Sequence, residues 1–158
     1  MPTPSSAFIT LANLLNRPLP LSFYTADPGA KASAYNLFLQ TLSHKSSALH
    51  DHITGLPDSD PESYLGDMFM ALFTGHLALD QAARLWDVYV FEGDAVLVRA
   101  GVALMMEKEM VLRATNSISE VKAVLEGHGG TGAETQRVVA RQGEEDAWMR
   151  AVREAGKA

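Results

Sequence analysis

The chain contains no cysteine among its 158 residues. The absence of thiols excludes disulfide bonds, a cysteine nucleophile, and zinc or iron–sulfur centres held by cysteine. Long apolar runs are missing as well. The longest, residues 93–106, is interrupted by Asp94 and Arg99 and is shorter than the roughly 20 residues that cross a bilayer. The first residues have no basic group ahead of an apolar stretch, so we expect no secretory signal, no direct membrane insertion and a cytoplasmic protein.

Positive charge is also scarce, since 13 Lys and Arg stand against 19 Asp and Glu, for a net charge of −6. An acidic chain does not attract phosphate backbones, so nucleic acid is not an expected partner. Patterns that hold metals or nucleotides are lacking. The five histidines have no spacing typical of a zinc site, and the glycines of 127–132 follow a helical pattern where a dinucleotide fingerprint needs a strand. We therefore expect no metal and no cofactor. The histidines are His44, His50, His52, His76 and His128.

The chain does have regular helical spacing of its apolar residues, which make up 47% of the sequence. No segment alternates as a strand does, so the predicted class is all-α: an irregular bundle of about six or seven helices plus a C-terminal tail helix. Pro18 and Pro20 are predicted to end the first helix. The expected helices are 7–15, 30–44, a short one around Leu49 and Ile53, one opened by Ser59–Glu62 and ended by Gly75, one capped by Asp80 and ended by Gly93, a buried one at 96–106, and one capped by Ser117 that runs through Leu125.

The composition divides the chain into three parts. Residues 5–126 form the helical subdomain, 127–133 a glycine-rich linker, and 134–155 the tail helix. Two alternatives stay open for the tail: it packs back on the subdomain through Trp148 and Val152, or it docks a partner chain. Within the subdomain, Arg99 lies in an apolar helix and is expected to pair with Asp94 or Asp87, because an unpaired buried charge is costly. The methionines at helical positions are predicted to fill the core. They are Met70, Met105, Met106 and Met110.

One stretch carries a more specific pattern. Residues 69–93 contain an aromatic-rich helix, then Arg84-x-Trp86-Asp87, a few apolar residues and Gly93, and a long apolar helix follows. This order resembles the C-terminal half of the TBC domain, the module that activates Rab GTPases. Upstream, 6–15 is similar to the family's Asp-Ala-Phe-Trp helix but lacks the acid and the tryptophan. The resemblance covers roughly residues 5–126 and implies the helical fold of that half-domain.

The resemblance implies a function, but the motifs that carry out that function in the family are missing from this chain. TBC domains supply an arginine from an Ile-Pro-x-Asp-x-x-Arg motif and a glutamine from Tyr-x-Gln, both in the N-terminal half, and this chain contains neither motif. Such an arginine accelerates hydrolysis by about 10³–10⁵. The resemblance therefore implies part of a Rab GTPase-activating protein that works only when the full domain is present. Alone, the chain is not expected to be an enzyme, and it is expected not to accelerate GTP hydrolysis. An expression fragment, a truncated product and a catalytically dead interaction scaffold remain open alternatives.

The same resemblance suggests partners and site residues. The expected partner is a Rab-family GTPase, with peripheral association with endomembranes as an open possibility. Arg84 and Asp87 are the candidate contacts. The favoured alternative is structural, with Trp86 filling the core and Gly93 ending the helix. No catalytic and no metal-binding residue is proposed. Loss of the N-terminal half would leave apolar surface, so we expect either a homo-oligomer or a tail that covers that surface.

Overall fold

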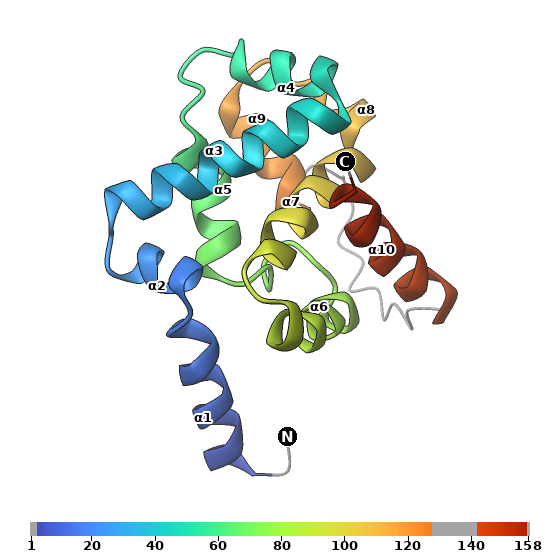
Figure 1. Ribbon diagram of the computed structural model, residues 1–158. Coiled ribbons are helices and arrows are strands. Elements are labelled where there is room, and N and C mark those ends of the chain that lie inside the picture. The colour runs from blue at the N-terminus through green and yellow to red at the C-terminus, as the bar shows by residue number, and fades with distance from the viewer. Residues whose placement is uncertain (1–2, 128–141, 158) are drawn as a thin grey trace.

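The computed structural model describes residues 3–127 and 142–157, and these residues form ten α-helices and no β-strand (Figure 1). The predicted all-α class is confirmed. In chain order the helices are α1 (Pro4–Leu15), α2 (Pro18–Tyr24), α3 (Pro28–Lys45), α4 (Ser47–Thr54), α5 (Pro61–Met70), α6 (Leu79–Glu92), α7 (Ala95–Glu107), α8 (Glu109–Leu112), α9 (Ile118–Leu125) and α10 (Gln142–Ala155).

Proline begins four of these helices, namely α1, α2, α3 and α5. The first helical residue has no intrahelical use for its N–H, and the fixed φ of proline suits that position. The prediction for Pro18 and Pro20 was therefore wrong in part: these residues follow the end of α1, but Pro18 also opens α2. Side-chain caps support the other starts. Asp27, for example, accepts hydrogen bonds from the Gly29 and Ala30 amides.

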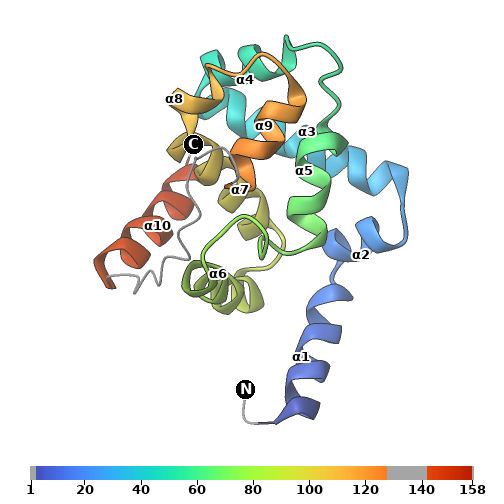
Figure 2. The same cartoon turned by 180° about the vertical axis from the view of Figure 1, so that it is seen from behind.

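Helix α7 lies at the centre of the molecule, with α3, α6 and α10 packed around it (Figures 1 and 2). Its residues are buried on nearly every side, as the apolar run 96–106 predicted. Beside it, aromatic rings from α3, from α5 and from the loop after α5 meet edge to face. The centroid of Phe38 lies 6.2 Å from that of Phe69, and the centroid of Phe69 lies 6.0 Å from that of Phe73. This geometry stabilises the α3–α5 contact beyond the burial of area alone.

Two expectations about the middle of the chain were wrong. The helix that starts near Ser59 ends at Met70 rather than near Gly75, and the chain continues as turns to Ala78. Leu72 and Phe73 have positive φ there, of 47° and 68°. Met110 lies on the short helix α8 and is 90% exposed, so it does not fill the core. Met105 is fully buried, as predicted.

The first helix stands away from the rest. Helix α1 projects from the body in both views (Figures 1 and 2), and Leu14 is its one buried residue. The stripe predicted to face the core is open to solvent at Phe8, which is 72% exposed, and at Leu11. Ile9 is exposed as well. Residues 3–16 contain no charged side chain. The apolar surface of α1 is therefore uncharged and uncovered.

The tail helix has the opposite environment. Helix α10 packs against α7 and α6, and Trp148, Met149, Val152 and Ala155 are buried there. Of the two alternatives for the tail, packing back on the subdomain is the one observed. The predicted start of the tail helix at 134, and the linker beyond Gly127, fall outside the described residues.

His76 lies in the loop between α5 and α6, and its Nδ1 is buried without a hydrogen-bond partner. Burial lowers the pKa of His76 below its ordinary value of 6.5, and the nearby Lys108 and Lys122 act in the same direction against Glu126 and Asp67. The unfolded chain therefore binds a proton more readily at this site than the folded chain. Protonation favours unfolding as the pH falls below 6.5.

We predict that His76→Gln flattens the acid side of the stability profile. The free energy of unfolding, measured by urea denaturation from pH 7.5 to pH 5, should fall less steeply with pH in the variant than in the wild type, because the variant lacks the proton uptake on unfolding. His44→Gln, at an exposed position, is the matched control. Equal slopes in wild type and His76→Gln would contradict the prediction.

Candidate functional site

The connection between α6 and α7 is a sharp corner at Gly93. Its backbone has φ 81° and ψ −164°, and its N–H bonds the Tyr89 carbonyl over 3.0 Å. This positive φ is a conformation that side chains with a Cβ rarely adopt. The expectation that Gly93 ends the helix is met, and the corner sets the direction from which α6 approaches α7.

Three side chains hold this corner against the junction of α1 and α2. Asp94 accepts the Leu19 amide through Oδ2 at 2.9 Å and the Tyr89 hydroxyl through Oδ1 at 3.0 Å. Arg17 donates from Nη2 to the Val90 carbonyl at 2.7 Å, and its guanidinium lies 4.9 Å from the centroid of the Tyr89 ring. The carboxylate thus binds the start of α2, and the guanidinium binds the end of α6. Charged groups placed in this way match the partial charges at the two helix ends.

The phenol of Tyr89 stays protonated in this environment. Burial and the Asp94 carboxylate raise its pKa well above the ordinary 10.0, although Arg17 opposes the shift. A phenol that keeps its proton is a permanent donor to Asp94. The corner therefore does not change its protonation around neutral pH through this residue.

Trp86 is half-buried against the core, and its indole Nε1 donates to the Leu72 carbonyl over 2.9 Å. Leu72 and its neighbour Phe73 are the two residues with left-handed backbone in the α5–α6 loop. Such conformations persist where the surroundings hold them. Trp86 ties α6 to this loop, so its position agrees with a structural role.

Arg84 and Asp87 both lie on the outer face of α6 and are exposed. They are three residues apart, which makes them neighbours on one helix face. Phe91 continues that face and is 88% exposed, whereas Leu85 and Tyr89 on the inner face are fully buried. We name the outer face formed by Ala83, Arg84, Asp87 and Phe91 the α6 face. It combines both signs of charge with an exposed aromatic ring.

Two pairing predictions were wrong. Arg99 binds Glu92, with Nη2 and Oε2 2.5 Å apart, instead of Asp94 or Asp87. Asp80 does not cap α6: the N-cap is Ala78, and Asp80 lies in the first turn. A carboxylate in the first turn still favours the helix through the dipole.

The roles of Arg17 and Tyr89 were missed because no local spacing joins two residues more than 70 positions apart. The one sequence signal was Pro18, which opens a helix whose next amide, from Leu19, needs an acceptor.

Among the described residues no three His, Asp or Glu side chains form a group that could hold a metal ion. None of the helices described is long and apolar enough to cross a membrane.

The comparisons with known proteins agree with the resemblance. The model of the Rab-GTPase-TBC domain family matches residues 1–112. The chain therefore belongs to the TBC domain family.

Individual relatives match the same region. TBC1 domain family member 12 of Rattus norvegicus is 33% identical over 108 residues, which is 68% of this chain and 15% of that protein. TBC1 domain family member 14 of Homo sapiens is 30% identical over 108 residues, again 68% and 15%. A TBC domain-containing protein of Schizosaccharomyces pombe is 32% identical over 100 residues, 63% of this chain and 21% of that protein. The chain thus spans a small part of these relatives. No solved structure matches it significantly.

We predict that Asp94→Ala lowers the free energy of unfolding by about 1–3 kcal/mol, because the Leu19 amide and the Tyr89 hydroxyl lose their acceptor. Urea denaturation at neutral pH measures the loss. The matched control is Asp87→Ala, an exposed change near the same corner that should stay within about 0.5 kcal/mol of the wild type. If the two variants lose equal stability, the bridging role assigned to Asp94 is wrong.

Proposed function

We propose that this chain is a recognition part of a Rab GTPase-activating protein and that the α6 face is its contact with the GTPase. The observation that carries this proposal is the contrast between the two sides of α6 in the segment that matches the family. The inner side is fixed by Trp86, Tyr89 and the corner at Gly93, while the outer side presents Arg84, Asp87 and Phe91 to solvent. Exposed arginine and aromatic side chains often contribute much of the binding energy at protein interfaces. Here a rigid helix presents both kinds of side chain.

In this proposal, the residues that accelerate GTP hydrolysis belong to another part of the whole TBC domain. The sequence contains neither the Ile-Pro-x-Asp-x-x-Arg nor the Tyr-x-Gln motif. Two of its arginines are also committed to structural contacts: Arg17 to the Val90 carbonyl and Arg99 to Glu92 and the Ala95 carbonyl. A catalytic arginine must be free to reach the transferring phosphoryl group. We therefore infer that the chain binds without accelerating hydrolysis.

Location follows from the partner in this proposal. The chain would act in the cytoplasm, in the control of vesicle traffic, and binding to a Rab on an endomembrane would bring it to that surface. No insertion of its own helices is needed for this.

The first experiment is a binding panel. The chain is tested against Rab GTPases loaded with GDP plus aluminium fluoride and, separately, with GDP alone. We predict that at least one member binds and that Arg84→Ala or Asp87→Ala weakens binding about tenfold or more, as at interface hot spots. Arg113→Ala, at an exposed position just after α8, is the control and should leave the affinity unchanged. A panel without a single binder would overturn the proposal.

A single-turnover GTP hydrolysis assay tests the inactivity. With any Rab that binds, the rate in the presence of saturating chain should equal the intrinsic rate, because the arginine worth about 10³–10⁵ is missing. The positive control is an activator that contains both motifs. Acceleration by this chain would show that another of its residues, with Arg84 the first to test, supplies the charge.

A second candidate function is self-association as a scaffold, which the exposed α1 favours. Phe8, Ile9 and Leu11 form an uncovered apolar surface on a segment without charges, and such surfaces promote association. We predict that light scattering gives a molar mass larger than that of one chain, and that this mass rises with concentration. The double variant Phe8→Ser, Leu11→Ser should have the molar mass of one chain. Leu37→Ser, exposed on α3, is the control. A wild-type mass of one chain at all concentrations would exclude this candidate.

A further inference from the structure

The tail helix α10 is an addition to the region that the family model matches, since that region ends at residue 112. It nevertheless covers α7, the central helix of that region. Four side chains anchor it there: Trp148, Met149, Val152 and Ala155 are each at most 6% exposed. Their spacing of one, four and seven residues places them on one face of the helix. We name the surface of α3, α6 and α7 under this face the tail groove.

The tail groove has a defined polarity because two cations lie at the C-terminal end of α10. Lys45, in the last turn of α3, donates from Nζ to the Lys157 carbonyl over 2.5 Å. The Arg99 side chain of α7 lies against Gly156, where a Cβ would come within 2.3 Å of the Arg99 Cδ. Cations stabilise the negative end of a helix dipole and its unpaired carbonyls. The groove thus fixes the direction of the helix, and a side chain at position 156 would displace Arg99.

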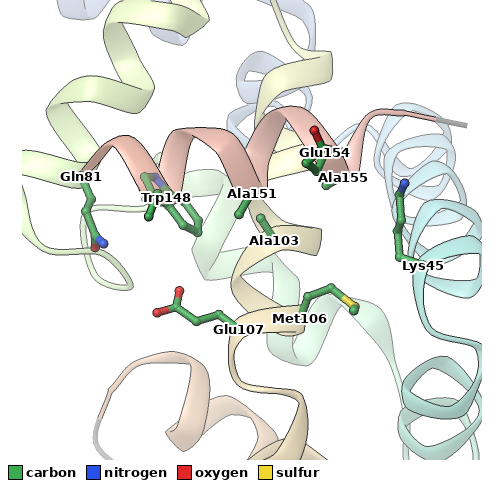
Figure 3. A pocket seen from close by; sticks show the side chains of 10 residues that line it. Lys45, Gln81, Ala103, Met106, Glu107, Trp148, Ala151, Glu154 and Ala155 are labelled. Carbon is green, nitrogen blue, oxygen red and sulfur yellow. The ribbon is translucent and has the colours of Figure 1, made fainter. Parts of the chain in front are cut away.

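Open space lies beside α10 in the tail groove. A half-open pocket of about 810 Å³ is lined in part by Ala103 and Met106 of α7 and Ala151 of α10. Figure 3 shows these residues between Trp148 at one end and Lys45 at the other. A second half-open pocket of about 580 Å³ lies by Val98 and Arg99.

The indole of Trp148 has an unsatisfied polar atom in this contact. Its Nε1 is buried without a hydrogen-bond partner, and an unpaired buried donor weakens packing. Helix α10 is therefore held by four apolar anchors and by directed contacts at its C-terminal end, and open space remains beside it.

We propose that the tail groove is a binding site for an amphipathic helix, that α10 is its tethered occupant, and that α10 of a second copy binds the same groove when the tethered helix leaves. Helix-in-groove binding needs apolar anchors at helical spacing, and α10 has them. A helix on the same chain meets its groove at an effective concentration on the order of millimolar. The tethered helix therefore excludes the second copy at micromolar protein concentrations.

The experiment uses the full chain with Val152→Asp, which places a charge at a fully buried anchor and expels the chain's own α10 without changing the groove. A fluorescent peptide of residues 142–157 is titrated by anisotropy. We expect the peptide to bind this variant at least about 100-fold more tightly than it binds the wild type, where the tethered helix competes. In the peptide, Gly156→Val should weaken binding roughly tenfold through the clash with Arg99. Arg150→Ala, on the exposed side of the helix, is the matched control and should bind as the wild-type peptide does.

Complementation tests the second copy. Ala103→Arg blocks the groove of one full chain but leaves its α10 intact, while Val152→Asp has the converse defect. Light scattering of a mixture of the two variants should show a one-to-one complex, with a molar mass larger than either variant has alone. Circular dichroism of each variant reports whether its other helices persist.

Three results would overturn the proposal. One is loss of the other helices when α10 is expelled, because α10 would then be an integral part of the core. Another is the absence of saturable peptide binding to a folded Val152→Asp chain. The third is peptide binding without a complex between the two variants, which would remove the second copy as an occupant. Equal binding of the Gly156→Val peptide would refute the direction assigned to the groove.

Discussion

The carboxylate of Asp94 is the contact on which the arrangement of this molecule depends. From the start of α7 it accepts the Leu19 amide in the first turn of α2, 75 positions away, and the hydroxyl of Tyr89 on α6. Helix ends carry unpaired backbone groups that must find partners. The carboxylate binds one such backbone group, the Leu19 amide, and also the Tyr89 side chain, while Arg17 binds the Val90 carbonyl. These contacts together join α2, α6 and α7. The outward direction of Arg84 and Asp87 follows from this arrangement.

Apolar periodicity predicted most of the fold because most helices bury one face. Helices α3, α6, α7 and α9 correspond closely to the spans expected from spacing and caps. Helix α2 was missed because proline has two meanings: it ends a helix within its interior and opens one at the first position. Spacing alone does not choose between these meanings at Pro18.

At the candidate site, the sequence pattern agrees with the exposure of the side chains but does not predict which distant residues are in contact. The exposure of Arg84 and Asp87 is consistent with the sequence pattern, since Leu85 and Tyr89 take the buried positions between and beyond them. The partners of Asp94 and Arg99 depend on which helix ends meet in space. Asp94 was one of two expected partners of Arg99, with Asp87 the other. Asp94 instead accepts from Leu19 and Tyr89, and Arg99 binds Glu92. Such pairings are decided by tertiary structure, which helical spacing does not encode.

The uncharged helix α1 gives the molecule an unusual response to salt. The chain has a net charge of −6, yet residues 3–16 carry none of that charge. Copies in solution repel one another through their bodies, and this repulsion acts over about 10 Å at 0.1 M ionic strength. Added salt screens the repulsion but leaves the attraction between apolar surfaces intact. The colloidal stability of this protein should therefore be greatest in dilute buffer and decline as electrolyte is added, whereas proteins held together by surface ion pairs dissociate under the same treatment.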